Sequence, residues 1–160
     1  MAKQKDIKTN AMRILDKSKT PYKVNYYECD EFIDGIQIAD MLGLPHDKVF
    51  KTLVTVGASK NYFVFVIPIA EELDMKKAAR SVGEKNVAMI HVKDINQVTG
   101  YIRGGCSPVG MKKKYPTYFD EVCLLFDEIA VSAGERGHQM ILPPNALVQL
   151  VDAELVDIIV

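Results

Sequence analysis

The hydrophobic pattern predicts two central strands joined by a tight turn. Residues 49–56 and 62–68 are rich in β-branched and aromatic residues, and the segment 57–61 between them is typical of a hairpin connection. The second segment is apolar at consecutive positions rather than at alternate ones, so both of its faces are expected to be buried. The pattern therefore places residues 62–68 in the middle of a sheet.

Helices are predicted where apolar residues recur at intervals of three or four. Ile7, Ala11, Ile14 and Leu15 have this spacing, and Asp6 before them is a residue type that caps helix N-termini. The other expected helices are residues 35–42 closed by Gly43, 71–82 closed by Gly83, 92–98, and 145–151 opened by Pro144.

Short strands complete the pattern. They are expected at residues 22–28, 87–91, 118–119, 129–132 and 139–142, with a helical turn at 121–126. Because short strands and helices follow one another without a regular βαβ order, the pattern favours the α+β class. The chain of 160 residues has no linker, repeat or low-complexity run, so we expect a single domain spanning residues 1–160.

Cysteine usage and the N-terminus indicate a cytoplasmic protein. Cys29, Cys106 and Cys123 are odd in number and lack CxxC spacing, which is typical of a reducing compartment. Residues 1–10 contain no apolar core of a secretory signal, and the longest apolar run, residues 62–70, is far shorter than a membrane span. The three histidines form no i, i+4 pair, so neither a metal nor another cofactor is expected.

A glycine-rich segment, residues 100–110, is the strongest candidate for a binding loop. It holds four glycines, Ser107 and Pro108. Adjacent glycines allow positive φ angles and a close approach to a ligand, and successive N–H groups can form a cup for a carbonyl oxygen or a phosphate. The spacing matches neither a P-loop nor a dinucleotide fingerprint. From the spacing alone, a structural turn remains an alternative.

Lys51 lies in the middle of a predicted apolar strand, on the same face as Val49 and Leu53. A charge is poorly tolerated there unless something compensates for it. From the pattern alone, an edge-strand lysine that deters aggregation explains the residue better than a functional role does. Thr52 falls on the opposite face, so both side chains can reach one ligand only through a bulge or twist of the strand.

Three motifs, in order, resemble the YbaK family of aminoacyl-tRNA deacylases, which is similar to the editing domain of bacterial prolyl-tRNA synthetases. They are Phe50-Lys51-Thr52-Leu53, the segment from Thr99 to Lys113, and Ser132-Ala133-Gly134-Glu135-Arg136-Gly137. The resemblance, which spans about residues 14–158, implies a mixed, mostly antiparallel sheet that is curled toward a barrel and surrounded by helices. It also implies cleavage of the aminoacyl ester of mischarged tRNA, with cysteine on the proline tRNA as the expected substrate.

The resemblance assigns expected roles to individual residues. Lys51 matches the family's functionally important lysine, and Gly104, Gly105 and Ser107 match its substrate loop, so these four form the expected catalytic group. The expected substrate-binding residues are Tyr27, Thr52, Tyr101, Pro108, Gly110 and Gln139. Lys112, Lys113 and Lys114 are expected to contact tRNA.

No nucleophile is paired with a base in any motif. Gln139 stands where some family members have an active-site aspartate, and an amide cannot act as a general base. Cys106 has no histidine tied to it by a motif, so we expect it to be structural. The family's chemistry instead implies that the thiol of the substrate attacks its own ester carbonyl and leaves as a thiolactone.

The charge balance limits the expected partners. The chain has 20 Lys and Arg against 21 Asp and Glu, and its formal net charge is −1. Tight binding of a nucleic acid needs excess positive charge, so we expect contact with the tRNA acceptor end alone, while prolyl-tRNA synthetase holds the rest. Neither DNA nor a membrane is an expected partner. Hydrolysis of Ala-tRNA(Pro) or another small aminoacyl-tRNA, and a non-catalytic module that binds tRNA or a synthetase, remain alternatives.

Overall fold

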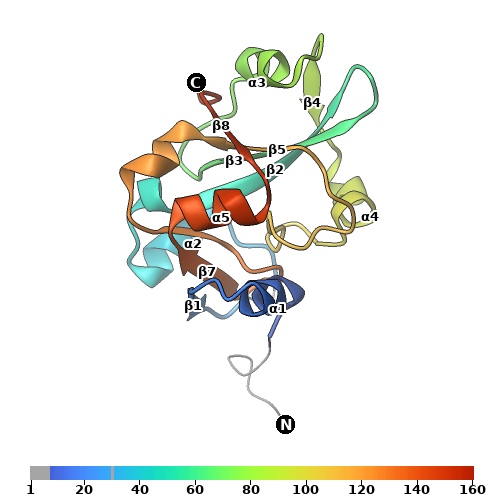
Figure 1. Ribbon diagram of the computed structural model, residues 1–160. Helices are drawn as coiled ribbons and strands as arrows, with labels where there is room; N and C mark the ends of the chain where they lie inside the picture. Colours follow the sequence, from blue (N-terminus) through green and yellow to red (C-terminus); the bar gives the residue numbers. More distant parts are fainter. Residues whose placement is uncertain (1–7, 30) are drawn as a thin grey trace.

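The computed structural model describes residues 8–29 and 31–160, and two β-sheets form its centre (Figure 1). The larger sheet has the order β4-β2-β3-β5-β8. Its strands are β2 (Phe50–Gly57), β3 (Tyr62–Pro68), β4 (Val87–Met89), β5 (Thr117–Asp120) and β8 (Glu154–Val156). Strand β2 is antiparallel to β3 and β4, whereas β3, β5 and β8 are parallel. The sheet is therefore mixed.

The smaller sheet is antiparallel throughout. Its order is β1-β7-β6, with β1 (Lys23–Tyr26), β6 (Ile129–Ser132) and β7 (His138–Leu142). A parallel bridge between Val49 and Ala130 joins the two sheets just before β2 begins. The main apolar core contains residues of both sheets, such as Val66 and Met140, and residues of α1 such as Leu15. One edge of β2 thus faces the smaller sheet.

Helices surround the sheets, and most begin at a side-chain cap. They are α1 (Asn10–Lys17), α2 (Gly35–Leu42), α3 (Met75–Val82), α4 (Ile95–Thr99) and α5 (Pro144–Leu150), with 3-10 turns η2 (His46–Lys48), η3 (Val92–Asp94) and η4 (Glu121–Leu125). Thr9, Asp34 and Asp74 cap α1, α2 and α3 by accepting N–H groups of the first turn. No helix among the described residues is long and apolar enough to cross a bilayer.

The structure confirms the α+β class and the central hairpin, and it corrects several boundaries. The first helix begins at Asn10 with Thr9 as its cap, whereas Asp6 and Ile7 lie outside the described residues. Helix α3 begins at Met75 rather than at Glu71, because the Asp74 carboxylate accepts two N–H groups there. Strand β8 was not predicted.

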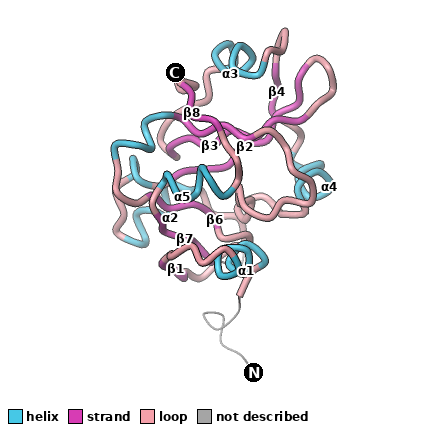
Figure 2. The backbone as a smooth tube through the Cα atoms, in the orientation of Figure 1, coloured by secondary structure: helices cyan, strands magenta, loops and turns pink. Residues whose placement is uncertain are grey.

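The glycine-rich segment lies in a long connection between α4 and β5. Figure 2 shows this connection as loop along most of its length, beside α4. Gly100, Gly104 and Gly110 all have positive φ angles, between 80° and 86°, which glycine adopts without steric cost. These turns bring one part of the segment toward β2 and another part toward α1.

Candidate functional site

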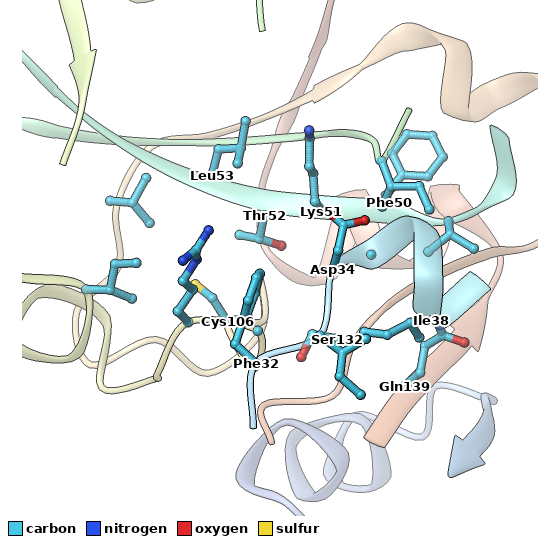
Figure 3. Close-up of a pocket in the computed structure, with 18 of the residues that line it drawn as sticks. Phe32, Asp34, Ile38, Phe50, Lys51, Thr52, Leu53, Cys106, Ser132 and Gln139 are labelled. Atoms are coloured by element: carbon cyan, nitrogen blue, oxygen red, sulfur yellow. The ribbon is translucent and has the colours of Figure 1, made fainter. Parts of the chain in front are cut away.

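A cavity of about 450 Å³ lies beside β2, between the two sheets (Figure 3). Strand β2, the start of α2, the glycine-rich segment and strands β6 and β7 all contribute to its wall. Residues predicted from the sequence that line it are Tyr27, Lys51, Thr52, Gly104 and Gln139. The sequence did not single out Phe32, Asp34, Arg103 and Ser132, which also line it.

Main-chain groups of β2 point alternately toward β3 and away from it. The Val49 carbonyl accepts a hydrogen bond from Ile69 N at 2.9 Å, and Gly57 N donates to Asn61 O at 2.8 Å. The main-chain N–H and C=O groups of the odd-numbered residues therefore point toward β3. Those of the even-numbered residues point toward the other edge of β2, where Val54 O accepts a hydrogen bond from Ile90 N at 3.2 Å.

Thr52 lies on a part of this second edge that no described strand covers. Strand β4 pairs with β2 only from Thr55 to Gly57, so the Thr52 N–H and C=O point toward the gap that the cavity occupies. The Thr52 hydroxyl is also buried without a hydrogen-bond partner among the described residues. A buried polar group in this state is costly unless a ligand or water satisfies it. Thr52 thus offers one donor, one acceptor and one hydroxyl to the cavity.

The Lys51 side chain projects from the face of β2 opposite to that of the Thr52 side chain (Figure 3). Figure 3 shows its side chain and that of Leu53 on the opposite side of the strand from Thr52, as the alternation predicts. Lys51 is half-buried, and burial lowers the pKa of its ammonium group, although the carboxylates of Asp34, Glu72 and Glu71 counteract this shift. The ammonium group is thus partly desolvated beside the cavity.

The wall opposite β2 comes from the smaller sheet. Gln139 is 4% exposed, and its Oε1 accepts a hydrogen bond from Asn25 Nδ2 at 3.1 Å. Ser132 is the register partner of Gln139. Tyr27 N donates to Gly137 O at 3.0 Å, and burial raises the pKa of the Tyr27 hydroxyl. This wall is therefore polar, and the side chain that Gln139 contributes to it is an uncharged amide.

Only part of the glycine-rich segment reaches the cavity. Arg103, Gly104 and Cys106 line it. Burial raises the pKa of the Cys106 thiol to about 12, and contact with the Thr99 hydroxyl offsets this only in part. Gly105 is buried, and its N–H donates to Ile102 O at 2.9 Å within the loop.

Four other predicted residues of the segment pack away from the cavity. Ser107 is fully buried, and its Oγ accepts a hydrogen bond from Val109 N at 3.2 Å. Tyr101 donates through its hydroxyl to Val109 O at 2.5 Å. Pro108 and Gly110 line a separate hollow beside Ile14 of α1.

The three consecutive lysines also lie outside the lining of the cavity. Lys112 Nζ donates to Gln97 O at 3.3 Å, and Lys114 Nζ pairs with Asp152 at 3.3 Å. Lys113 borders the hollow beside α1. No group of three or more His, Cys, Asp and Glu side chains is arranged to hold a metal ion within residues 8–29 and 31–160.

Ser132 ends the predicted strand β6, whereas the other three residues that the sequence missed come from segments without a periodic signal. Asp34 serves as the cap of α2, and Phe32 lies in an irregular stretch between β1 and α2. Arg103 belongs to the glycine-rich segment, but no motif distinguished it from its neighbours. Their place at the cavity depends on the long-range packing of two connections, the one between β1 and α2 and the one between α4 and β5.

A family model described as an aminoacyl-tRNA editing domain matches residues 35–150 of the chain. Among curated proteins, EbsC of Enterococcus faecalis is 46% identical over 160 residues, covering 99% of this chain and 98% of its own length. Its name gives a provisional assignment as a Cys-tRNA(Pro)/Cys-tRNA(Cys) deacylase.

A proline–tRNA ligase of Fervidobacterium nodosum is 33% identical over 75 residues, which are 47% of this chain and 13% of that enzyme. Among solved structures, one described as a provisional trans-editing enzyme for prolyl tRNA synthetase has a TM-score of 0.78 at 26% identity. That match covers 87% of each chain.

Proposed function

The chain belongs to the family of aminoacyl-tRNA editing domains, and we propose that it is a deacylase that removes a wrongly attached amino acid from tRNA. Its principal substrate in this proposal is cysteine esterified to the proline tRNA, and residues 1–160 act as one trans-editing domain. The deacylase name of a relative that is 46% identical over nearly the whole chain supports this choice.

The free edge at Thr52 is the observation that carries the proposal. In an antiparallel sheet, a residue donates through its N–H and accepts through its C=O with a single partner residue. An aminoacyl ester has the same pair of groups, an α-amine that donates and a carbonyl that accepts. The uncovered main chain of Thr52 therefore suits one amino acid attached to a tRNA, and its buried hydroxyl without a partner is a third contact.

The side chains of the cavity favour attack by the substrate itself. At pH 7 the Cys106 thiol stays protonated because its pKa is about 12, and a protonated thiol is a poor nucleophile. No histidine lines the cavity among the described residues, and the Ser107 hydroxyl is committed to Val109. A cysteinyl substrate carries its own thiol to the ester.

The proposed reaction conserves all atoms of the substrate. The substrate sulfur forms a bond to its own ester carbonyl carbon, the bond from that carbon to the ribose oxygen breaks, and the thiol proton ends on the ribose oxygen. The products are a four-membered thiolactone and uncharged tRNA. Holding the thiol against the carbonyl supplies most of the acceleration in such a ring closure.

The proposal gives the candidate residues graded roles. Thr52 and Gln139 orient the aminoacyl group, Tyr27 closes the wall beside them, and the Gly104 N–H stabilises the developing oxyanion. Lys51, a half-buried cation beside the cavity, favours a neutral substrate amine by charge repulsion. Gly105, Ser107, Tyr101, Pro108 and Gly110 hold the loop in shape.

Recognition of the tRNA body is a separate part of the proposal. With a net charge of −1, the chain has little general affinity for phosphates. We infer that it holds the acceptor end and that prolyl-tRNA synthetase presents the remainder. Contacts of Lys112, Lys113 and Lys114 with tRNA remain proposals, since these residues lie away from the cavity lining.

One observation favours a second function, a non-catalytic module that binds tRNA or a synthetase. Gln139 already accepts a hydrogen bond from Asn25, and an amide cannot act as a general base. A cavity of this kind can bind an aminoacyl group without cleaving it.

A comparison of three charged forms of one tRNA tests the proposal. Purified protein should cleave Cys-tRNA(Pro) and leave Pro-tRNA(Pro) intact, and mass spectrometry with an amine trap should detect the thiolactone. Ala-tRNA(Pro) should bind nearly as well, since one small group changes recognition by about 1–3 kcal/mol, but it should turn over far more slowly. Comparable turnover of Ala-tRNA(Pro) would show that water attacks the ester. Binding without turnover of any substrate would favour the non-catalytic module.

A further inference from the structure

An aromatic ring and two arginines meet at the mouth of the cavity. The Phe32 side chain is 38% exposed, and the Arg103 guanidinium carbon lies 4.0 Å from the centroid of its ring. The Arg136 guanidinium carbon lies 6.0 Å from the same centroid. We call these three residues the mouth cluster. Phe32 and Arg103 both line the cavity, so the cluster lies within reach of any group that enters.

A side-chain hydrogen bond to the main chain and the close approach of Gly104 hold the mouth cluster in place. Arg136 Nε donates a hydrogen bond to Arg103 O at 2.8 Å, which ties the β6–β7 turn to the glycine-rich segment. A Cβ atom on Gly104 would lie 3.1 Å from Phe32 Cδ2 and 3.3 Å from Arg136 Nε. Glycine at this position therefore lets the ring and the guanidinium approach the loop. The arrangement is preorganised before any ligand arrives.

Neither Arg103 nor Arg136 is neutralised by an ion pair with a carboxylate among residues 8–29 and 31–160. In a chain with more acidic than basic residues, two unpaired cations on one ring are a local positive site. An exposed aromatic face beside guanidinium groups is the surface on which bases of single-stranded nucleic acids stack.

We propose that the mouth cluster binds the terminal nucleoside of the acceptor end, with its base stacked on Phe32 and Arg103 and its phosphate beside Arg136. This inference rests on the proposed function, because an aminoacyl group inside the cavity places the ribose that carries it at the opening. Exposed apolar side chains at the same opening, Met89 and Val92, offer further surface for a base or a ribose. The mouth cluster can thereby bind a single-stranded end although the chain as a whole has a formal net charge of −1.

Two matched substrates separate stacking from a structural role of Phe32. One is a cysteinylated acceptor minihelix ending in adenosine, and the other has the same terminal ribose without its base. On the intact minihelix, Phe32→Ala should lower kcat/KM about 5- to 150-fold, mainly through KM, which is the usual effect of losing one stacked base. On the abasic substrate, which the wild type itself should cleave poorly, the same substitution should change little. Phe32→Tyr should retain activity.

Control variants define the site of the effect. Ile102→Ala, at the position before Arg103, removes an exposed apolar side chain that is not part of the cavity lining, and it should behave as wild type. For Arg136→Gln, the slope of log affinity against log salt should fall by about 0.7, as expected when one single-strand phosphate contact is lost.

The outcomes distinguish this inference from the proposed function. If the wild type cleaves both substrates equally well, or if Phe32→Ala slows both by the same factor, the stacking proposal is wrong while deacylation stands. An unchanged salt slope in Arg136→Gln would overturn the phosphate contact. If the wild type cleaves neither the minihelix nor full-length Cys-tRNA(Pro), the proposed function itself fails.

Discussion

Residues 103–110 of the glycine-rich segment form two four-residue halves, which both contain glycine but have different surroundings. Residues 103–106 include two glycines, and three of the four, Arg103, Gly104 and Cys106, border the cavity. Residues 107–110 turn inward, where Val109 joins the apolar core and Gly110 approaches α1. Composition indicates only that the chain must turn tightly, and the neighbours of each residue decide whether the turn serves a ligand or the core.

The core-facing half should respond to substitution mainly through stability, and Gly110→Ala should have the largest effect. Gly110 has a φ of +80°, and a Cβ atom there would lie 2.8 Å from Tyr101 Oη and 2.9 Å from Asn10 Nδ2. Left-handed strain and overpacking together predict a loss of about 3 kcal/mol in the free energy of unfolding. Urea denaturation measures this loss, while deacylation per folded molecule should remain close to wild type.

Gly43→Ala provides the matched control for this prediction. Gly43 also has a positive φ, +67°, but no atom lies within 4 Å of the position of an added Cβ. It should lose only the conformational part, about 1 kcal/mol. Equal losses in both variants would show that packing beside α1 adds nothing at Gly110.

Ser107→Ala sharpens the comparison with a smaller effect. The substitution removes the acceptor for Val109 N in a fully buried turn, and an unsatisfied buried N–H predicts a loss of about 1–3 kcal/mol in stability. Activity per folded molecule should be unchanged. A large fall in kcat with normal stability would instead place the Ser107 hydroxyl in the reaction and weaken the division of the segment.

The hydrophobic pattern predicted the parts of the fold that local periodicity controls. The β2–β3 hairpin and the helices closed by Gly43 and Gly83 follow from apolar spacing and stop signals. Strand β8 escaped because its three residues have no alternation of their own, and their pairing with β5 is parallel and non-local. Local pattern carries little information about such contacts.

Two residues of the candidate site were predictable from motifs that resemble a known family rather than from periodicity. Thr52 and Gln139 were assigned in this way, and both line the cavity. Phe32 and Arg103 were not, because each gains its place from a loop–loop contact that no spacing rule describes. Ser107 and Gly110 match a motif, yet the turn directs them to the core.

Cys106 tests the cavity-facing half, and its substitution should have the smallest effect on catalysis. Because burial raises the thiol pKa to about 12, the thiolate is scarce at neutral pH, and Cys106→Ala should retain most deacylation.

The raised pKa of the Cys106 thiol also has a consequence for stability. The folded form holds the proton more tightly than the unfolded chain, so this contribution is complete below about pH 9 and is lost as the pH rises toward 12. Between pH 9 and pH 10, wild type should lose about 1 kcal/mol more stability than Cys106→Ala, as measured by urea denaturation at each pH. Carrying out both measurements in a Cys29→Ala background removes the half-buried Cys29 thiol from the comparison. A collapse of turnover in Cys106→Ala at pH 7 would show that the thiol takes part in the chemistry. Equal alkaline losses of stability in the two proteins would show that the thiol ionises as readily in the folded state as in the unfolded chain.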